Sequence, residues 1–247
     1  MANSSETGHA KNVAYFERLV TNVTALGATY NPSKANLKLV ALNTQLTNAK
    51  AAIAAVNSAE PAYKNAVSAR DVAFTALSKL ITRVNNALKA SDTTVQSDKS
   101  TMTLVRKLQG RRATPKLTEE EKKAAAEKGN EVVQISASQM SFDSRLDTLD
   151  KLIKLLTSVT AYAPNEADLK VLALTIVYND LKAKNTAVIA AETPLINARI
   201  ARNDTLYKPL TGLVDISVDV KTYVKSIYGA TSPQYKAISG MKFTSYQ

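Results

Sequence analysis

Side chains that could act as nucleophiles, general acids or metal ligands are scarce in this sequence. The 247 residues include a single histidine, His9, and no cysteine. A serine nucleophile would therefore have one possible imidazole base, and thiolate chemistry is excluded. There is no glycine-rich phosphate loop and no spacing typical of a zinc or calcium site. We predict a protein that is not an enzyme and that has no catalytic residue, metal, cofactor or evident small-molecule substrate.

Three aspartates, Asp143, Asp147 and Asp150, come closest to an acid–base cluster. Their spacing places the three carboxylates on one face of a helix, where paired carboxylates could in principle exchange protons. Negative charge in the first turns of a helix is also stabilised by the helix dipole. We therefore interpret these aspartates as part of the helix rather than as a catalytic group.

Two arginines, Arg70 and Arg202, fall among apolar residues that recur at helical intervals. A guanidinium in such a position needs a carboxylate or several carbonyl partners, unless its long side chain reaches out to solvent. One interpretation is a structural polar contact that fixes the register of the helices. The other is an anion or ligand site inside each helical domain. We favour the structural role and expect both side chains to be at least partly buried, at equivalent positions.

Positive charge is concentrated in two segments. Residues 99–116 and 220–247 contain no acid and hold most of the cationic excess in a chain whose formal net charge is +11. The second segment also contains aromatic residues, which could stack on bases or line a protein interface. Such patches are typical of surfaces that bind nucleic acid, the ribosome or an acidic protein, although they also occur as plain solvated charge. The candidate polyanion-binding residues are Arg106, Lys107, Arg111, Arg112 and Lys116.

The helices that would position these residues are encoded twice. The heptapeptide NLKLVAL at residues 36–42 recurs as DLKVLAL at residues 168–174, an offset of 132 positions. The same offset pairs Tyr30 with Tyr162, and before Tyr30 the offset becomes 133. This pattern predicts an internal duplication. The two copies cover residues 12–110 and 145–243.

Each copy has the apolar periodicity of long helices. Leucine, isoleucine, valine and phenylalanine recur at alternating intervals of three and four, as in helices packed against neighbours. In residues 34–90 this pattern predicts two helices of about 26–29 residues, or roughly 40 Å each. We expect the two helices to pair as an antiparallel hairpin with a shorter helix on either side, and residues 166–222 to match them.

Prolines predict helix boundaries in the second copy. Pro209 lacks a backbone donor and would clash with the preceding turn, so we expect a bend there. The dipeptides Thr193-Pro194 and Ser232-Pro233 have the N-cap and first-turn proline that are typical of helix starts.

The predicted fold is all-α, with two tandem, homologous, elongated antiparallel helical bundles. Only 7 glycines and 7 prolines among 247 residues, with 45% apolar residues, favour helices and a substantial core. The predicted domains are a first bundle, a basic linker with a charged connecting helix, and a second bundle. They span residues 1–110, 111–140 and 141–247.

No apolar run approaches the roughly 20 residues that a membrane helix needs. The first residues, MANSSETGHAK, are polar and lack the apolar stretch of a signal peptide. We therefore expect a cytoplasmic protein without a membrane span.

These features favour a non-enzymatic scaffold or adaptor that acts through protein–protein contacts, with a protein partner or self-assembly. The alternative is a nucleic-acid- or ribosome-associated protein that binds polyanions through residues 99–116 and 220–247. The two functions differ in their response to salt, because affinity that depends on phosphate contacts falls steeply as ionic strength rises.

Overall fold

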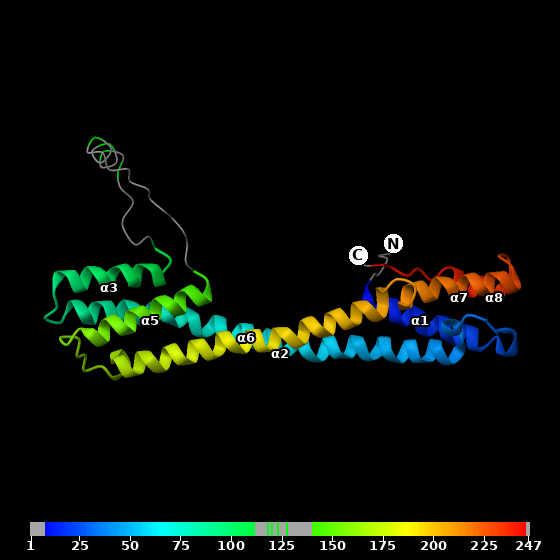
Figure 1. The fold of residues 1–247 in the computed structure, drawn as a ribbon, viewed down its shortest axis with the longest axis horizontal. Helices are drawn as coiled ribbons and strands as arrows, with labels where there is room; N and C mark the ends of the chain where they lie inside the picture. The colour runs from blue at the N-terminus through cyan, green and yellow to red at the C-terminus, as the bar shows by residue number, and fades with distance from the viewer. Residues whose placement is uncertain are drawn as a thin grey trace, which may run out of the picture. The chain divides into compact units, whose positions relative to one another are not determined.

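The computed structural model describes residues 8–111, 118, 120, 123, 127 and 140–245. In these residues all regular secondary structure is helical, which confirms the predicted all-α class (Figure 1). The α-helices are α1 (His9–Thr24), α2 (Leu39–Lys89), α3 (Val95–Leu108), α5 (Phe142–Ser158), α6 (Val171–Tyr207), α7 (Leu213–Tyr228) and α8 (Pro233–Ser239). Three short 3-10 helices are η1 (Gly27–Thr29), η2 (Ala35–Leu37) and η3 (Ala167–Leu169). None of the helices described is long and apolar enough to cross a membrane.

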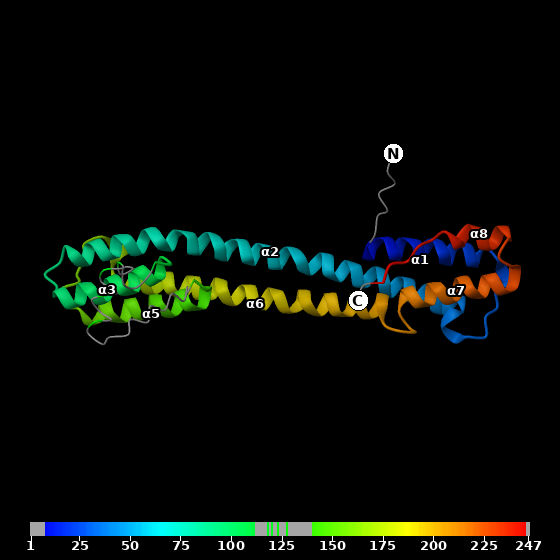
Figure 2. The same ribbon diagram turned by 90° about the horizontal axis from the view of Figure 1, so that it is seen from above.

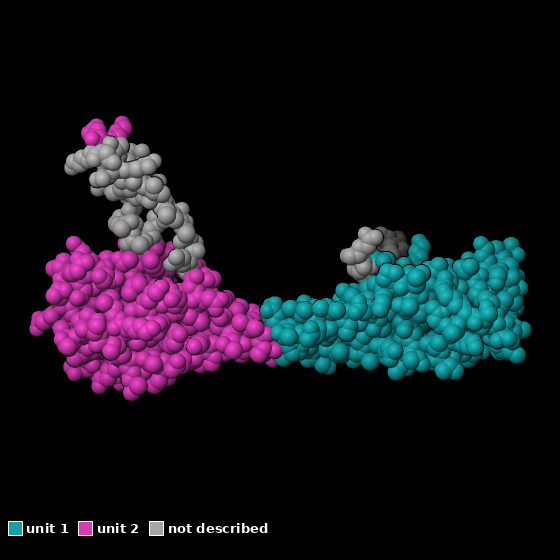
Figure 3. Space-filling model, viewed as in Figure 1, with its two compact units in different colours: residues 1–64, 191–247 teal, residues 65–190 magenta. Residues whose placement is uncertain are grey.

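The chain divides into two compact units, which are coloured separately in Figure 3. Unit 1 comprises residues 1–64 and 191–247, and unit 2 comprises residues 65–190. Unit 1 therefore takes α1 and the first part of α2 from one half of the sequence, and the last part of α6, α7 and α8 from the other. The predicted domain boundaries at residues 110 and 140 are not boundaries of these units.

In unit 1, α7 packs against both α1 and α8, as Figures 1 and 2 show. The core contains Phe16 and Leu19 from α1, Leu42 from α2, Leu206 from α6 and Val220 from α7, all fully buried. Burial of an aliphatic or aromatic side chain of this size contributes about 1.5–3 kcal/mol. The apolar positions at intervals of three and four are the ones that face this core, as the periodicity predicts.

In unit 2, α3 packs along α5. Phe74 and Ile81 of α2 meet Leu149 and Leu152 of α5 and Leu108 of α3 in a second buried cluster. Thr94 caps α3, since its side chain accepts a hydrogen bond from the backbone N–H of Ser97. The cap and the apolar face together fix where α3 begins and which side of it is buried.

The predicted hairpin in the first copy is wrong, because α2 runs without a turn from Leu39 to Lys89. Pro61 lies inside this helix, where it cannot donate a hydrogen bond to the carbonyl of Asn57. The residues around it are rich in alanine and contain no glycine, so good helix formers on both sides carry the helix past the lost bond. The predicted helix start at Thr193-Pro194 is wrong for the same reason, since Pro194 lies within α6.

Two other boundaries are confirmed. Ser232 caps α8 by accepting a hydrogen bond from the backbone N–H of Tyr235, and Pro233 is the first residue of the helix. The predicted interruption at Pro209 is also present, because it lies between α6 and α7. Gly212 follows, at a position where a Cβ atom would lie 2.7 Å from backbone atoms of neighbouring residues. Only glycine fits this close approach of the chain to itself.

Two segments separated by 132 residues have the same local structure. The Tyr30 hydroxyl donates to the carbonyl of Leu37 at 2.8 Å, and the Tyr162 hydroxyl donates to the carbonyl of Leu169 at 2.7 Å. Burial raises the pKa of both hydroxyls, that of Tyr162 to about 12, so both remain protonated donors. The residue after η2 has φ −63° and ψ 145°, and the residue after η3 has φ −63° and ψ 146°. These details support the predicted duplication.

Candidate functional site

Arg70 lies on α2 in unit 2, with a side chain that is only 18% exposed. Its guanidinium carbon Cζ lies 3.8 Å from the centre of the Phe142 ring. Its Nη1 donates to Oδ1 of Asn185 at 3.4 Å, and its Nε is 3.8 Å from the Asp71 carboxylate. A planar guanidinium that stacks on an aromatic face in this way is held by cation–π attraction as well as by packing.

The partners of Arg70 are themselves held in place. Asn185 is buried on α6 and donates from Nδ2 to Oδ1 of Asp143, on α5, at 2.8 Å. Phe142 packs edge-on against Phe74, with ring centroids 4.8 Å apart. Arg70 therefore sits in a closed cluster of ring, amide and carboxylate that joins α2, α5 and α6 within unit 2. We call Arg70, Phe142, Asp143 and Asn185 the Arg70 cluster.

Arg202 lies on α6 in unit 1 and is half-buried. Its Nε and Nη2 donate to the side-chain oxygen of the adjacent Asn203, at 3.1 and 2.9 Å. In the part of the chain that the structure describes, no carboxylate lies within ion-pair distance of Arg202. The expectation that both arginines are partly buried is confirmed, but the surroundings of the two differ.

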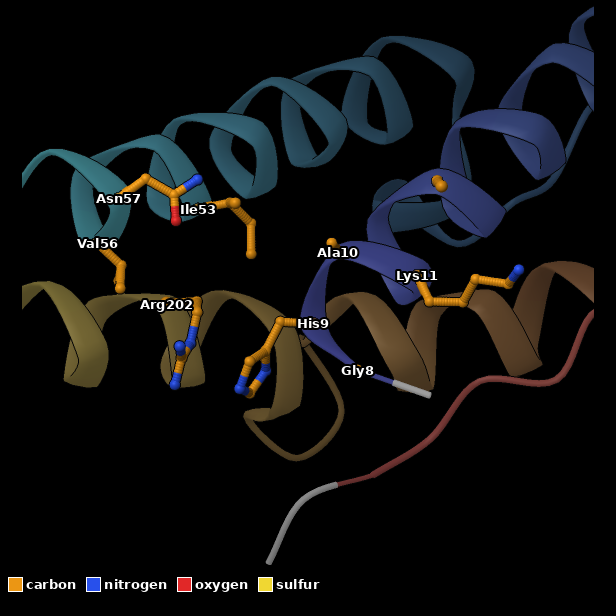
Figure 4. Close-up of a pocket in the computed structure, with 9 residues that line it drawn as sticks. Gly8, His9, Ala10, Lys11, Ile53, Val56, Asn57 and Arg202 are labelled. Carbon is orange, nitrogen blue, oxygen red and sulfur yellow. The ribbon is translucent and has the colours of Figure 1, made fainter. Parts of the chain in front are cut away.

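Arg202 lines a cavity of about 750 Å³ within unit 1, shown in Figure 4. The side chains of Arg202 and His9 lie side by side there, Ile53 and Val56 point toward them from α2, and Lys11 extends away. The ε-ammonium of Lys11 lies 4.8 Å from the centre of the Tyr15 ring. The described residues that line it are Gly8, His9, Ala10, Lys11, Ala14, Ile53, Val56, Asn57 and Arg202. We call this space the Arg202 cavity.

His9 is fixed on one side of the Arg202 cavity. Its Nδ1 and the Tyr207 hydroxyl share a hydrogen bond of 2.6 Å, and the two rings pack at 5.6 Å. Partial burial lowers the pKa of His9, and the positive charge of Arg202 lowers it further. The imidazole is therefore mainly neutral near pH 7.

Offsets of 132 and 133 pair the residues around the two arginines, and the paired residues differ in type. Residues 9, 10, 142 and 143 lie just outside the two predicted copies. At offsets of 132 and 133, the ring, carboxylate and amide of the Arg70 cluster are replaced in unit 1 by an imidazole, a methyl group and an aliphatic side chain. The corresponding pairs are Arg70 and Arg202, Phe142 and His9, Asp143 and Ala10, and Asn185 and Ile53. Sequence reasoning identified the arginines and considered His9 and Asp143 in other roles, but it missed Phe142, Ala10, Asn185 and Ile53. A comparison of the sequence with itself at these offsets would have found them.

Three of the five candidate polyanion-binding residues lie in the described part of the chain. Arg106 and Lys107 are in the last turn of α3, and Arg111 follows it, with its backbone N–H donating to the carbonyl of Arg106 at 2.8 Å. Arg106 and Arg111 line one cavity of about 210 Å³ in unit 2. Arg112 and Lys116 lie outside the described residues.

Two aromatic residues of the segment 220–247, Tyr223 and Tyr228, are engaged within unit 1. Tyr223 packs edge-on against Tyr30 at 5.3 Å, and the Tyr228 hydroxyl lies 2.6 Å from the side-chain oxygen of Thr29. Lys221 donates to a backbone carbonyl at 2.9 Å, and burial lowers the pKa of its ammonium group. These tyrosines therefore stabilise the unit and do not form an open surface for stacking bases.

The aspartates that could have formed an acid–base cluster are paired with other groups. Asp147 and Asp150 each form an ion pair of 2.6 Å with a lysine one turn further along α5, Lys151 and Lys154. Asp143 belongs to the Arg70 cluster. Within the residues described, no group of three or more histidine, aspartate or glutamate side chains could hold a metal ion.

Comparison of the chain with protein-family models, curated proteins and solved structures finds no match. Its function therefore has to be inferred from its own residues.

Proposed function

We propose that the protein is a non-enzymatic helical scaffold or adaptor that acts in the cytoplasm through protein–protein contacts. Large apolar side chains exposed on α6 are the observation that carries this proposal. In unit 1, Ile196 is 44% and Ile200 is 54% exposed, and in unit 2, Leu172 is 74% and Ile176 is 61% exposed. Each pair is spaced by four residues and so lies on one face of the helix. Paired aliphatic side chains on an outer helix face are typical of surfaces that bind protein.

The double variant Ile196→Asp/Ile200→Asp tests this proposal. The matched control is Asn197→Asp/Ala201→Asp, which places the same two charges one residue further along, at positions that are also exposed. Cross-linking in cells followed by quantitative mass spectrometry should recover a stoichiometric protein partner with the parent and the control and lose it with the isoleucine variant. Analytical ultracentrifugation of the purified proteins should detect the same loss if the partner is a second copy. Equal recovery with both variants, or no partner with any of them, would overturn the proposal.

A second candidate function is the binding of nucleic acid or a ribosomal surface through the basic segments. It is favoured by the cationic end of α3, where Arg106 and Arg111 line one cavity and Lys107 lies on the same turn. The variant with Arg106, Lys107, Arg111 and Arg112 changed to glutamine should bind labelled RNA more weakly at low salt, with a flatter salt dependence. A parent protein without measurable affinity at low ionic strength would remove this candidate.

We also propose that residues 12–110 and 145–243 are two copies of one ancestral segment. The paired tyrosine hydrogen bonds, the matching 3-10 helices and the corresponding arginines support this proposal. In this arrangement each compact unit contains the first part of one copy and the last part of the other. The fold would then not consist of two tandem bundles with one copy each. Each of its two units would contain parts of both copies.

A further inference from the structure

We propose that the Arg202 cavity binds a small organic carboxylate with an apolar, aromatic body. This inference is independent of the scaffold function proposed above, because it concerns a different surface of unit 1. It rests on the composition of the cavity and on the comparison with the Arg70 cluster.

The cationic side of the cavity fits a carboxylate. A guanidinium presents its N–H donors in a planar fork that matches the two oxygens of a carboxylate. Two donors of Arg202 are directed to Asn203, a neutral amide, so its positive charge is not neutralised by that contact. None of the residues described as lining the cavity is an acid. A ligand carboxylate would supply the missing negative charge.

The other side of the cavity fits an apolar group. Ile53 and Val56 point into it from α2 (Figure 4), and the small side chains of Ala10 and Ala14 of α1 also line it. The volume of about 750 Å³ lies within the roughly 300–1,000 Å³ of small-molecule sites, which are mostly apolar with a few polar groups that orient the ligand. A ligand without an apolar body would leave this wall in contact with water.

Unit 2 indicates which apolar body suits this position. The Phe142 ring covers the guanidinium of Arg70, and the neighbouring Asp143 supplies a carboxylate that reaches the arginine through the amide of Asn185. An aromatic ring and a carboxylate joined by a short linker thus complete the same arginine position elsewhere in the molecule. In unit 1, Ile53 is the residue paired with Asn185 by sequence offset, and it has no bridging amide, so a ligand carboxylate would contact Arg202 directly.

His9 supplies a reporter for such a ligand, because it is the only histidine in the chain and lies beside Arg202. Among the described residues, the ionisable groups near it include Arg202 and Tyr207 from α6 and Lys11 on its own helix. A carboxylate bound beside Arg202 would stabilise the imidazolium and raise the pKa of His9 toward or above its ordinary value. The NMR resonances of a single histidine follow this change without ambiguity.

The experiment titrates the full-length protein with 3-phenylpropanoate and follows the His9 resonances and the heat of binding. We expect saturable binding, a raised pKa of His9, and affinity reduced at least about tenfold in Arg202→Gln, since a charge-assisted hydrogen bond is lost. Arg199→Gln, which removes an exposed arginine on the same helix, should bind as the parent does. His9→Phe, which places a protein ring beside Arg202 where the ring of the ligand would lie, should also bind weakly. Thermal melting of each variant, monitored by circular dichroism, checks that unit 1 remains folded.

Two further probes separate the carboxylate from the apolar body. 3-Phenylpropanol, which lacks the charge, and inorganic phosphate, which lacks the ring, should each bind at least tenfold more weakly than 3-phenylpropanoate. The proposal is overturned if either probe binds as well as 3-phenylpropanoate. Unchanged affinity in a folded Arg202→Gln variant, or no response of His9 up to solubility-limited ligand, would overturn it as well.

Discussion

Arg70 and Arg202 lie 132 residues apart, at positions that correspond in the proposed duplication, yet the first is enclosed and the second lines a cavity. In unit 2, Arg70 is covered by Phe142 and held by Asn185, which in turn holds Asp143. In unit 1, Arg202 contacts only the side chain of its neighbour Asn203 by hydrogen bonds and lines a cavity. At the paired positions of α1 and α2, unit 1 has His9, Ala10 and Ile53 in place of the ring, carboxylate and amide of unit 2.

A guanidinium removed from water must recover its lost hydration from other groups. In unit 2 the chain itself provides a ring and an amide–carboxylate pair, so the arginine contributes to stability and joins α2, α5 and α6. The described residues of unit 1 do not provide these partners for Arg202. Its guanidinium can therefore bind a carboxylate from solution. One helix position can therefore serve stability in one unit and recognition in the other.

The largest expected effect comes from removing the ring that covers Arg70. Phe142→Ala deletes the edge-on contact with Phe74 and uncovers the guanidinium, and should lower the free energy of unfolding by about 2–3 kcal/mol. His9→Ala, the corresponding change in unit 1, should lower it by less than about 1 kcal/mol. Urea unfolding of both variants, monitored by circular dichroism, measures the difference. Equal losses of unfolding free energy in the two variants would show that Phe142 does not stabilise unit 2 more than His9 stabilises unit 1.

Truncation of each arginine to alanine should give a smaller difference in the free energy of unfolding between the two positions. Arg70→Ala removes a cation–π contact and one hydrogen bond, so we expect a loss of about 1–2 kcal/mol. Arg202→Ala removes only contacts to a neighbouring, exposed asparagine and should stay within about 0.5 kcal/mol of the parent. The same unfolding measurement applies. A larger loss at Arg202 than at Arg70 would contradict the assignment of the structural role to Arg70.

The sequence predicted the helical class, the core-facing positions and the partial burial of the two arginines, because each depends on local apolar periodicity. Phe16 and Leu19 of α1, for example, have the spacing of a buried face and are buried. The break at Pro209 followed from the geometry of proline, and the glycine at residue 212 completes it.

The continuity of α2 and the composition of the units could not be predicted in the same way. Pro61 has the chemistry of a helix boundary, but its neighbours favour the helix strongly enough to continue it. Periodicity identifies an apolar face without identifying its partner. Whether Arg70 meets Phe142 and Asn185 or other residues depends on which parts of the long helices pack together, and those contacts link residues far apart in the sequence.

Placing an aromatic ring beside Arg202 tests whether Phe142 alone accounts for the different surroundings of Arg70 and Arg202. His9→Phe places an aromatic side chain beside Arg202, as Phe142 does beside Arg70, and should raise the free energy of unfolding by about 0.5–1 kcal/mol. The nuclear Overhauser contacts of the new ring should include the Arg202 side chain. A destabilised variant, or a ring without contacts to Arg202, would mean that the backbone of unit 1 does not allow the arrangement of unit 2.

The smallest expected effect is the pH dependence that arises from a histidine, which only unit 1 contains. Burial, and secondarily the charge of Arg202, lowers the pKa of His9 in the folded protein below its ordinary value of 6.5. As pH falls through about 6.5, the unfolded chain takes up a proton more readily than the folded chain, so stability decreases. Above about pH 7.5 both states are neutral and His9 contributes no slope.

Unfolding measured at intervals from pH 8 to pH 5 should therefore show a part of the acid destabilisation that is absent in His9→Gln. Arg202→Gln should reduce that part without abolishing it, because burial is the larger cause of the lowered pKa and remains when the charge is removed. A bound 3-phenylpropanoate would act in the same direction as the arginine substitution, since its negative charge favours the imidazolium. Identical pH profiles for the parent and His9→Gln would show that the surroundings of His9 do not disfavour its protonation. The surroundings of Arg70 and Arg202 would then differ in packing, but the charge of Arg202 would have no measurable effect on the protonation of His9.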